Sequence, residues 1–118
     1  EHAPQALMRW GIRALVGVSF AEIVHGNCLA LGIPCATASS DQIKQLQAAV
    51  SADATASWSL DLQTCQCRSE AAGEWGVGFE SGALEMLLSG RWDATSQLVA
   101  RDAELKQTMA ALPYLNGF

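Results

Sequence analysis

Positive charge is scarce in this sequence of 118 residues: 7 Lys and Arg stand against 12 Asp and Glu, which leaves a net charge of −5. The basic residues do not cluster in any stretch of the chain. Nucleic acids and anionic membrane surfaces attract proteins through clustered positive charge. We therefore expect neither a nucleic-acid partner nor a membrane partner.

Long apolar runs are also missing. The longest lie at residues 12–18 and 28–33, whereas a helix that crosses a bilayer needs about 20 mostly apolar residues. We find no signal peptide or lipidation motif. These absences favour a cytoplasmic location, with a plastid as the alternative if the true N-terminus lies upstream of Glu1.

Groups that bind metals or attack substrates are few. The two histidines, His2 and His25, are not placed to activate a cysteine, and we find no glycine-rich phosphate loop. We interpret His25, in a helix next to Gly26, as a surface or satisfied residue rather than a ligand. The spacing of the four cysteines (Cys28, Cys35, Cys65 and Cys67) is not that of a zinc site, so we favour reduced, partly buried thiols. Cys65 and Cys67 could be neighbours on one strand face, with a thiol-based metal module as the weaker alternative.

What the sequence does contain is enough apolar surface for a core. Half of its residues are hydrophobic and 16% are charged, which is typical of a globular chain. The length suits one domain over residues 1–118. The order of the predicted elements gives an α/β fold with a parallel half and an antiparallel half.

The first third predicts a parallel βαβ unit. A helix at residues 4–10 should end at Gly11, and the β-branched run 12–18 is typical of a strand buried on both faces. A Ser19–Glu22 capping box then predicts a helix, ended by Gly32 and interrupted near Gly26. We expect it to carry inward Phe20, Ile23 and Val24. Residues 33–38 form the second strand, reached by a right-handed crossover.

The remainder predicts helices around an antiparallel hairpin. The stretch Ser39-Ser40-Asp41-Gln42 should cap a helix whose inner stripe is Ile43, Leu46 and Val50. Alternating apolar residues predict strands at 58–63 and 75–79, paired across a turn-rich connection at 68–74. A helix at 83–89 closed by Gly90 and a helix at 94–111 capped by Asp93 form a C-terminal helical pair. Pro113 should stop the last helix and leave a tail at 114–118.

Five stretches occur in an order that one family shares. They are "EHAPQAL", "GIRALVGVSFAEI", "GNCLALGIP", "WSLDL" and "LEMLLSGRWDATSQL", and they span nearly the whole chain. Together they resemble the small subunit of 3-isopropylmalate dehydratase, a family similar to the swivelling domain of aconitase. The segments Val24-His25-Gly26 and 91–95 depart from the family pattern. The resemblance implies a partial swivelling β/β/α domain, the C-terminal portion of the family domain.

The resemblance also implies that the chemistry lies upstream. "EHAP" looks like the second half of a Gly-Ser-Ser-Arg-Glu-His-Ala-Pro signature, in which a serine is the base and the arginine binds a carboxylate. Both would lie just before Glu1, so we expect no catalytic residue, cofactor-binding residue or metal ligand within these 118 residues. Glu1 and His2 would support that loop; ordinary first-turn polar residues are the alternative.

The implied activity is a hydro-lyase reaction in leucine biosynthesis that interconverts 2- and 3-isopropylmalate. A large subunit with a [4Fe–4S] cluster is the expected partner, and a dicarboxylate is the expected substrate. The alternatives are a related hydro-lyase acting on homoaconitate, citraconate or dimethylmalate, and a non-catalytic fragment. We expect the chain to be inactive alone, and its exposed sheet edges would favour self-association.

Overall fold

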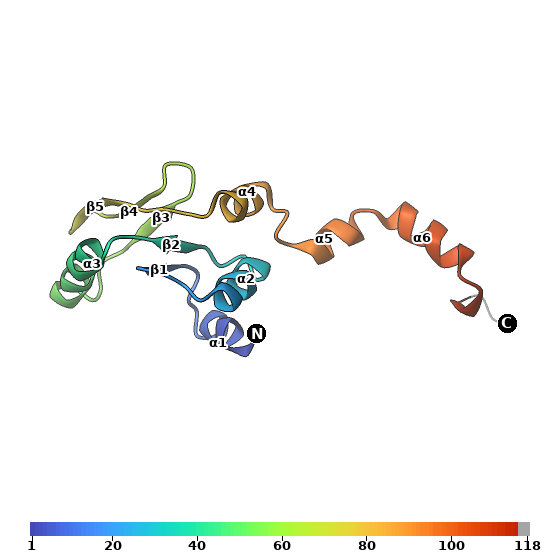
Figure 1. Cartoon of the computed structure of the whole chain (residues 1–118), viewed down its shortest axis with the longest axis horizontal. Coiled ribbons are helices and arrows are strands. Elements are labelled where there is room, and N and C mark those ends of the chain that lie inside the picture. Colours follow the sequence, from blue (N-terminus) through green and yellow to red (C-terminus); the bar gives the residue numbers. More distant parts are fainter. Residues whose placement is uncertain (116–118) are drawn as a thin grey trace.

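A computed structural model describes residues 1–115 as a mixed α/β fold (Figure 1). Within these residues, β1 and β2 form a parallel sheet, and β3, β4 and β5 form an antiparallel sheet in that order. The elements are α1 (His2–Arg9), β1 (Leu15–Gly17), α2 (Glu22–Ala30), β2 (Cys35–Thr37), α3 (Ser40–Ala52), β3 (Ser59–Asp61), β4 (Gln66–Ser69), β5 (Gly73–Gly76), α4 (Ser81–Ser89), α5 (Ala94–Val99), α6 (Asp102–Ala111) and the 3-10 helix η1 (Pro113–Leu115).

The predicted βαβ unit is confirmed. β1 and β2 pair in parallel, with Leu15 opposite Cys35, and α2 connects them. Each strand has three residues and is shorter than the predicted range. The expectation that the first strand is buried on both faces is wrong. All three residues of β1 are only half-buried, because β1 is an edge of a two-stranded sheet.

The start of α2 differs from the prediction. Its N-cap is Ala21, which makes no side-chain capping bond, so the predicted Ser19–Glu22 capping box is wrong. The ring of Phe20 lies close to Gly17, where an added Cβ would be 3.2 Å from Phe20 Cζ. We infer that this contact holds residue 20 in the connection and delays the start of the helix.

Two of the three side chains predicted to face the core from this segment do so. Phe20 and Val24 pack against it as predicted, but Ile23 is 78% exposed. The helix also continues through Gly26 without the predicted interruption.

The predicted glycine stops after α1 and α2 are confirmed. Gly11 and Gly32 have φ values of +98° and +70°, a left-handed conformation that glycine adopts without a Cβ clash. Beyond α2, Gly32 N–H donates to Leu29 O and Ile33 N–H donates to Cys28 O, both at 2.9 Å. These two hydrogen bonds together form a Schellman motif, which satisfies the last carbonyl groups of the helix.

The helix α3 confirms its predicted cap. Ser39 Oγ accepts from Gln42 N–H at 3.2 Å, and Gln42 Oε1 accepts from Ser39 N–H at 2.9 Å. In the predicted inner stripe, Leu46 is buried and Ile43 packs on the core, but Val50 is 45% exposed. The stripe is therefore correct except at its last position.

The predicted two-stranded hairpin is wrong, because a third strand lies within it. β4 pairs with both β3 and β5, and it includes part of the segment predicted as a turn-rich connection. The alternation that predicts a strand at 75–79 belongs partly to β5 and partly to the segment after it. There, Gly78 forms an antiparallel bridge with Thr37, which joins the two sheets.

The core has two parts. One lies between α1, α2 and the parallel sheet and contains Cys28, Ile33 and Cys35. The other lies between the parallel sheet, α3 and the antiparallel sheet, and it contains Ala36, Leu46, Cys67 and Val77.

The C-terminal region has more helices than the predicted pair. α4 ends at Gly90, whose φ is +74°, and Asp93 caps α5, as predicted. The single helix expected at 94–111 is wrong, because the chain leaves helical geometry at Arg101 and divides it into α5 and α6. The last helix ends at Ala111, before Pro113, as predicted. Residues 114 and 115 of the predicted tail belong to η1, and residues 116–118 lie outside the described residues.

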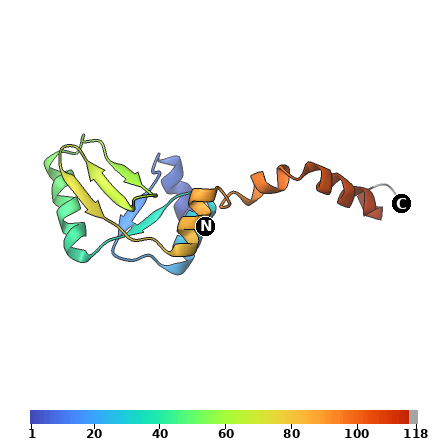
Figure 2. The same cartoon turned by 90° about the horizontal axis from the view of Figure 1, so that it is seen from above.

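The helices α5 and α6 project from the body as an arm (Figures 1 and 2). The longest dimension of the molecule is 66 Å, against 27 and 25 Å for the others. Apolar side chains of the arm, and of η1 after it, are exposed: Leu98, Val99, Leu105, Met109, Tyr114 and Leu115.

Candidate functional site

The two predicted site residues lie at the start of α1. Glu1 is the N-cap and makes no side-chain capping bond, and His2 is the first helical residue. Both are exposed. The first N–H groups of a helix have no intrahelical partners and carry partial positive charge. The geometry therefore presents hydrogen-bond donors beside Glu1 and His2, suited to an anionic group.

The rest of α1 is anchored, which fixes the direction of this N-terminus. Pro4 is fully buried, and Met8 packs against the Cys28 part of the core. At the other end, Gly11 N–H donates to Met8 O and Ile12 N–H donates to Leu7 O, both at 3.0 Å. Arg13 Nη1 also donates to Met8 O at 3.0 Å.

His25 is paired rather than free. Its Nδ1 lies 3.7 Å from Oε2 of Glu80, the N-cap residue of α4. The His25 side chain is 21% exposed. This partly exposed contact agrees with the interpretation of His25 as a surface or satisfied residue rather than a ligand. The contact joins α2 to α4, which Figures 1 and 2 place at the end of the body from which the arm leaves. Sequence reasoning missed this pair because 55 positions separate its members and nothing local links them.

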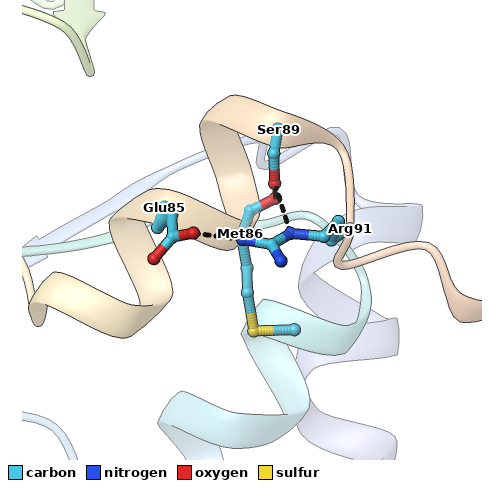
Figure 3. Close-up of polar contacts among 4 residues, drawn as sticks. All are labelled: Glu85, Met86, Ser89 and Arg91. Atoms are coloured by element: carbon cyan, nitrogen blue, oxygen red, sulfur yellow. Dashed lines mark hydrogen bonds and ion pairs between the residues drawn. The ribbon is translucent and has the colours of Figure 1, made fainter.

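Arg91 is a second polar residue that sequence reasoning did not select. It forms an ion pair with Glu85, and its Nε donates to Ser89 Oγ at 3.2 Å (Figure 3). Ser89 Oγ in turn donates to Met86 O at 3.4 Å. A cation at a helix C-terminus is favourable because the last carbonyls carry partial negative charge. Arg91 therefore stabilises the end of α4 just before the arm begins.

An open apolar groove of about 830 Å³ lies between β1, α3 and the antiparallel sheet. Its apolar walls come from Val16 of β1, Ile43, Leu46 and Val50 of α3, and Trp58, Leu60 and Cys67 beside or within β3 and β4. In the described part of the chain, β1 and β3 are edge strands. The expected exposed sheet edges are thus present, and they border an apolar surface.

The four cysteines are free thiols, as expected, and three of them are buried. Burial, together with the neighbouring Cys28 thiol, raises the pKa of Cys35 to about 12. Burial also raises the pKa of Cys67. A thiol attacks or binds metal as the thiolate, so both side chains are poor nucleophiles at neutral pH.

The interpretation of Cys65 and Cys67 as neighbours on one strand face is wrong. Cys67 lies in β4, but Cys65 precedes that strand with φ of +55°, inside the turn after β3. Among residues 1–115, no group of three or more His, Cys, Asp and Glu could hold a metal ion. In the same residues, we find no helix with the length and apolar character needed to span a bilayer.

Comparison with known proteins identifies similar sequences over nearly the whole chain. The chain is 47% identical to the 3-isopropylmalate dehydratase small subunit of Synechocystis sp., over 98% of this chain and 58% of that protein. It is 35% identical to the protein of the same name from Thermus thermophilus and 31% identical to that from Shewanella oneidensis. These matches cover 97% and 96% of this chain and 56% of each relative.

These comparisons confirm the resemblance carried by the motifs. The chain spans little more than half the length of the curated relatives it matches. No protein-family model matches the sequence.

Proposed function

We propose that this chain is part of the small subunit of a 3-isopropylmalate dehydratase, the hydro-lyase that interconverts 2- and 3-isopropylmalate in leucine biosynthesis. The observation that carries the proposal is the 47% identity to a small subunit of that name over 98% of this chain. The proposal includes a swivelling β/β/α domain, of which residues 1–118 are one portion. The parallel and antiparallel sheets described above supply support for it.

The reaction needs two groups that act on adjacent carbons. A base removes a proton from one carbon, and a Lewis acid accepts the hydroxyl that leaves the other. We assign the base to a serine in a Gly-Ser-Ser-Arg loop preceding Glu1, and carboxylate binding to the arginine of that loop. The Lewis acid belongs to a large subunit that carries a [4Fe–4S] cluster.

The thiols of this chain do not fit such a cluster. Cluster ligation requires three or four thiolates that converge on one site. Cys28 and Cys35 lie in one part of the core and Cys67 lies in the other. This separation supports placing the cluster on the partner subunit.

The role of these residues in the proposal is to position the upstream loop. That loop enters α1 at its N-terminus, where the free N–H groups and the helix dipole stabilise a carboxylate of the substrate. Glu1 and His2 act there as positioning residues. Buried Pro4 and the closed end of the helix at Gly11 support this role, because they hold α1 against the body.

We expect the rest of the small subunit to cover the apolar groove between β1, α3 and the antiparallel sheet. An apolar surface with two neighbouring edge strands is a site for added β-structure. The relatives contain this additional polypeptide, since the chain covers 58% of the Synechocystis protein. We assign the groove to that part of the subunit, and we assign the assembled enzyme to the cytoplasm, or to a plastid if a leader is present.

A chimera tests the proposed activity. The region of the Synechocystis small subunit that matches this chain is replaced by these 118 residues, and the product is combined with the cluster-loaded large subunit of that organism. We expect isomerisation of 2-isopropylmalate at a rate comparable with that of the unaltered small subunit, which is the matched control.

The same assay separates the alternative substrates. Turnover of homoaconitate, citraconate or dimethylmalate in place of isopropylmalate would assign the chain to a related hydro-lyase. A folded chimera that binds the large subunit and converts none of these four substrates would contradict the proposal.

A further inference from the structure

Two buried thiols that the proposed function does not use lie together beneath α1. Cys28 is 0% exposed and Cys35 is 5% exposed, and with Ile33 they form one cluster. Met8 of α1 and Leu15 of β1 pack against this cluster. The two cysteines therefore lie where α1, α2 and the parallel sheet meet.

The backbone between the two cysteines explains their proximity. Cys28 is in the last turn of α2, and its carbonyl accepts from Ile33 N–H at 2.9 Å, which reverses the chain at Gly32. Cys35 then begins β2, with its Sγ 3.9 Å from Ile33 O. The end of α2 is thus held close to the start of β2 by backbone hydrogen bonds, which do not depend on the thiols.

We propose that Cys28 and Cys35 are an oxidisable dithiol that closes to a disulfide and joins the end of α2 to the start of β2. With hydrogen peroxide, one thiolate attacks a peroxide oxygen, and the O–O bond breaks to give a sulfenic acid and hydroxide. The second thiol attacks that sulfur, the S–O bond breaks, and water leaves. In total, two thiols are oxidised, and one peroxide is reduced to two waters.

The surroundings make this a protected dithiol. The thiolate is the reactive form, and the raised pKa of Cys35, about 12, leaves little thiolate at neutral pH. Burial also keeps the oxidant away from both sulfurs. Oxidation should therefore be slow in the folded state and should accelerate with rising pH or when α1 opens.

Tryptic mapping of the complete 118-residue chain tests the proposal. Cleavage after Arg13, Lys44 and Arg68 places Cys28 and Cys35 in one peptide and Cys65 and Cys67 in another. After peroxide treatment, we expect the peptide 14–44 to lose two hydrogens in mass and to regain them on reduction. Sub-denaturing urea should increase the rate of this loss.

Two variants test whether the mass loss comes from a disulfide between Cys28 and Cys35. Cys35→Ala should abolish the mass loss in peptide 14–44, and Cys65→Ser should leave it unchanged. If Cys35→Ala fails to fold, the wild-type peptide map alone decides. Sulfinic acid at Cys28 or Cys35 without a disulfide, or a disulfide from either residue to Cys65 or Cys67, would overturn the proposal. The outcome is independent of the proposed enzymatic function, because the assay measures no activity.

Discussion

At the residue scale, Gly32 combines two constraints. Its φ of +70° is strained for any residue with a Cβ, and such a Cβ would lie 2.7 Å from Cζ2 of Trp92. Trp92 precedes Asp93, the N-cap of α5, so this contact holds the segment before the arm close to the end of α2. The end of α2 at Gly32 could be predicted from the sequence. The contact with Trp92 could not, because 60 positions separate the two residues.

We predict that Gly32→Ala destabilises the fold by about 1–3 kcal/mol, since the left-handed conformation and the clash both oppose a methyl group. Gly26→Ala is the matched control, because Gly26 is within α2 and its added Cβ meets no atom within 4 Å. That change should stabilise the helix by about 0.5–1 kcal/mol. Urea unfolding measures both, and equal effects would contradict the prediction.

We predict that the folded chain loses stability at alkaline pH because of Cys35. Its pKa is raised from 9.0 to about 12 in the folded chain, so folding favours the neutral thiol. The resulting stability is fully present below pH 9 and is lost as the pH rises through about 12. The free energy of unfolding of wild type should fall more steeply over this range than that of Cys35→Ala. Parallel curves would show that the thiol does not titrate as described.

At the element scale, local signals predicted several helix ends but missed the start of α2 and the strand β4. Ser39, Gly11, Gly32 and Gly90 act as predicted because caps depend on a few neighbouring residues. The strand β4 was missed because its sequence, QCRS, has little β-branched or aromatic character. It is a strand because β3 and β5 pair with it on both sides.

The Ser39 cap gives a test at this scale. Ser39→Ala removes the acceptor of the Gln42 N–H bond and should cost about 1 kcal/mol of stability. Ser40→Ala alters an adjacent exposed serine inside α3 and should have little effect. Thermal unfolding followed by circular dichroism compares the two variants. A larger loss from Ser40→Ala would contradict the assigned cap.

At the scale of the whole molecule, residues 1–115 expose apolar side chains on two surfaces. One is the groove bordered by β1 and β3, and the other is the arm formed by α5 and α6. The sequence indicated the exposed edges through its resemblance to longer proteins. It did not indicate the arm, because the spacing of Leu98, Leu105 and Met109 is equally typical of a helix packed on a core.

We predict that the isolated chain self-associates through the groove. Val50 lines the groove and is 45% exposed, so Val50→Glu should weaken association at little cost to folding. Val99→Glu makes the same change on the arm, at a side chain that is 67% exposed. Sedimentation at several concentrations compares both with wild type. Dissociation caused only by Val99→Glu would place the contact on the arm instead.

We propose that these residues form the scaffold of a small subunit whose base lies upstream of Glu1. The most direct test is the rate of isopropylmalate isomerisation with the cluster-loaded large subunit present. The 118-residue chain is compared with the same chain extended upstream through Gly-Ser-Ser-Arg. We predict activity from the extended chain and none from the shorter one. Equal rates from the two chains would show that the base does not lie in the added segment.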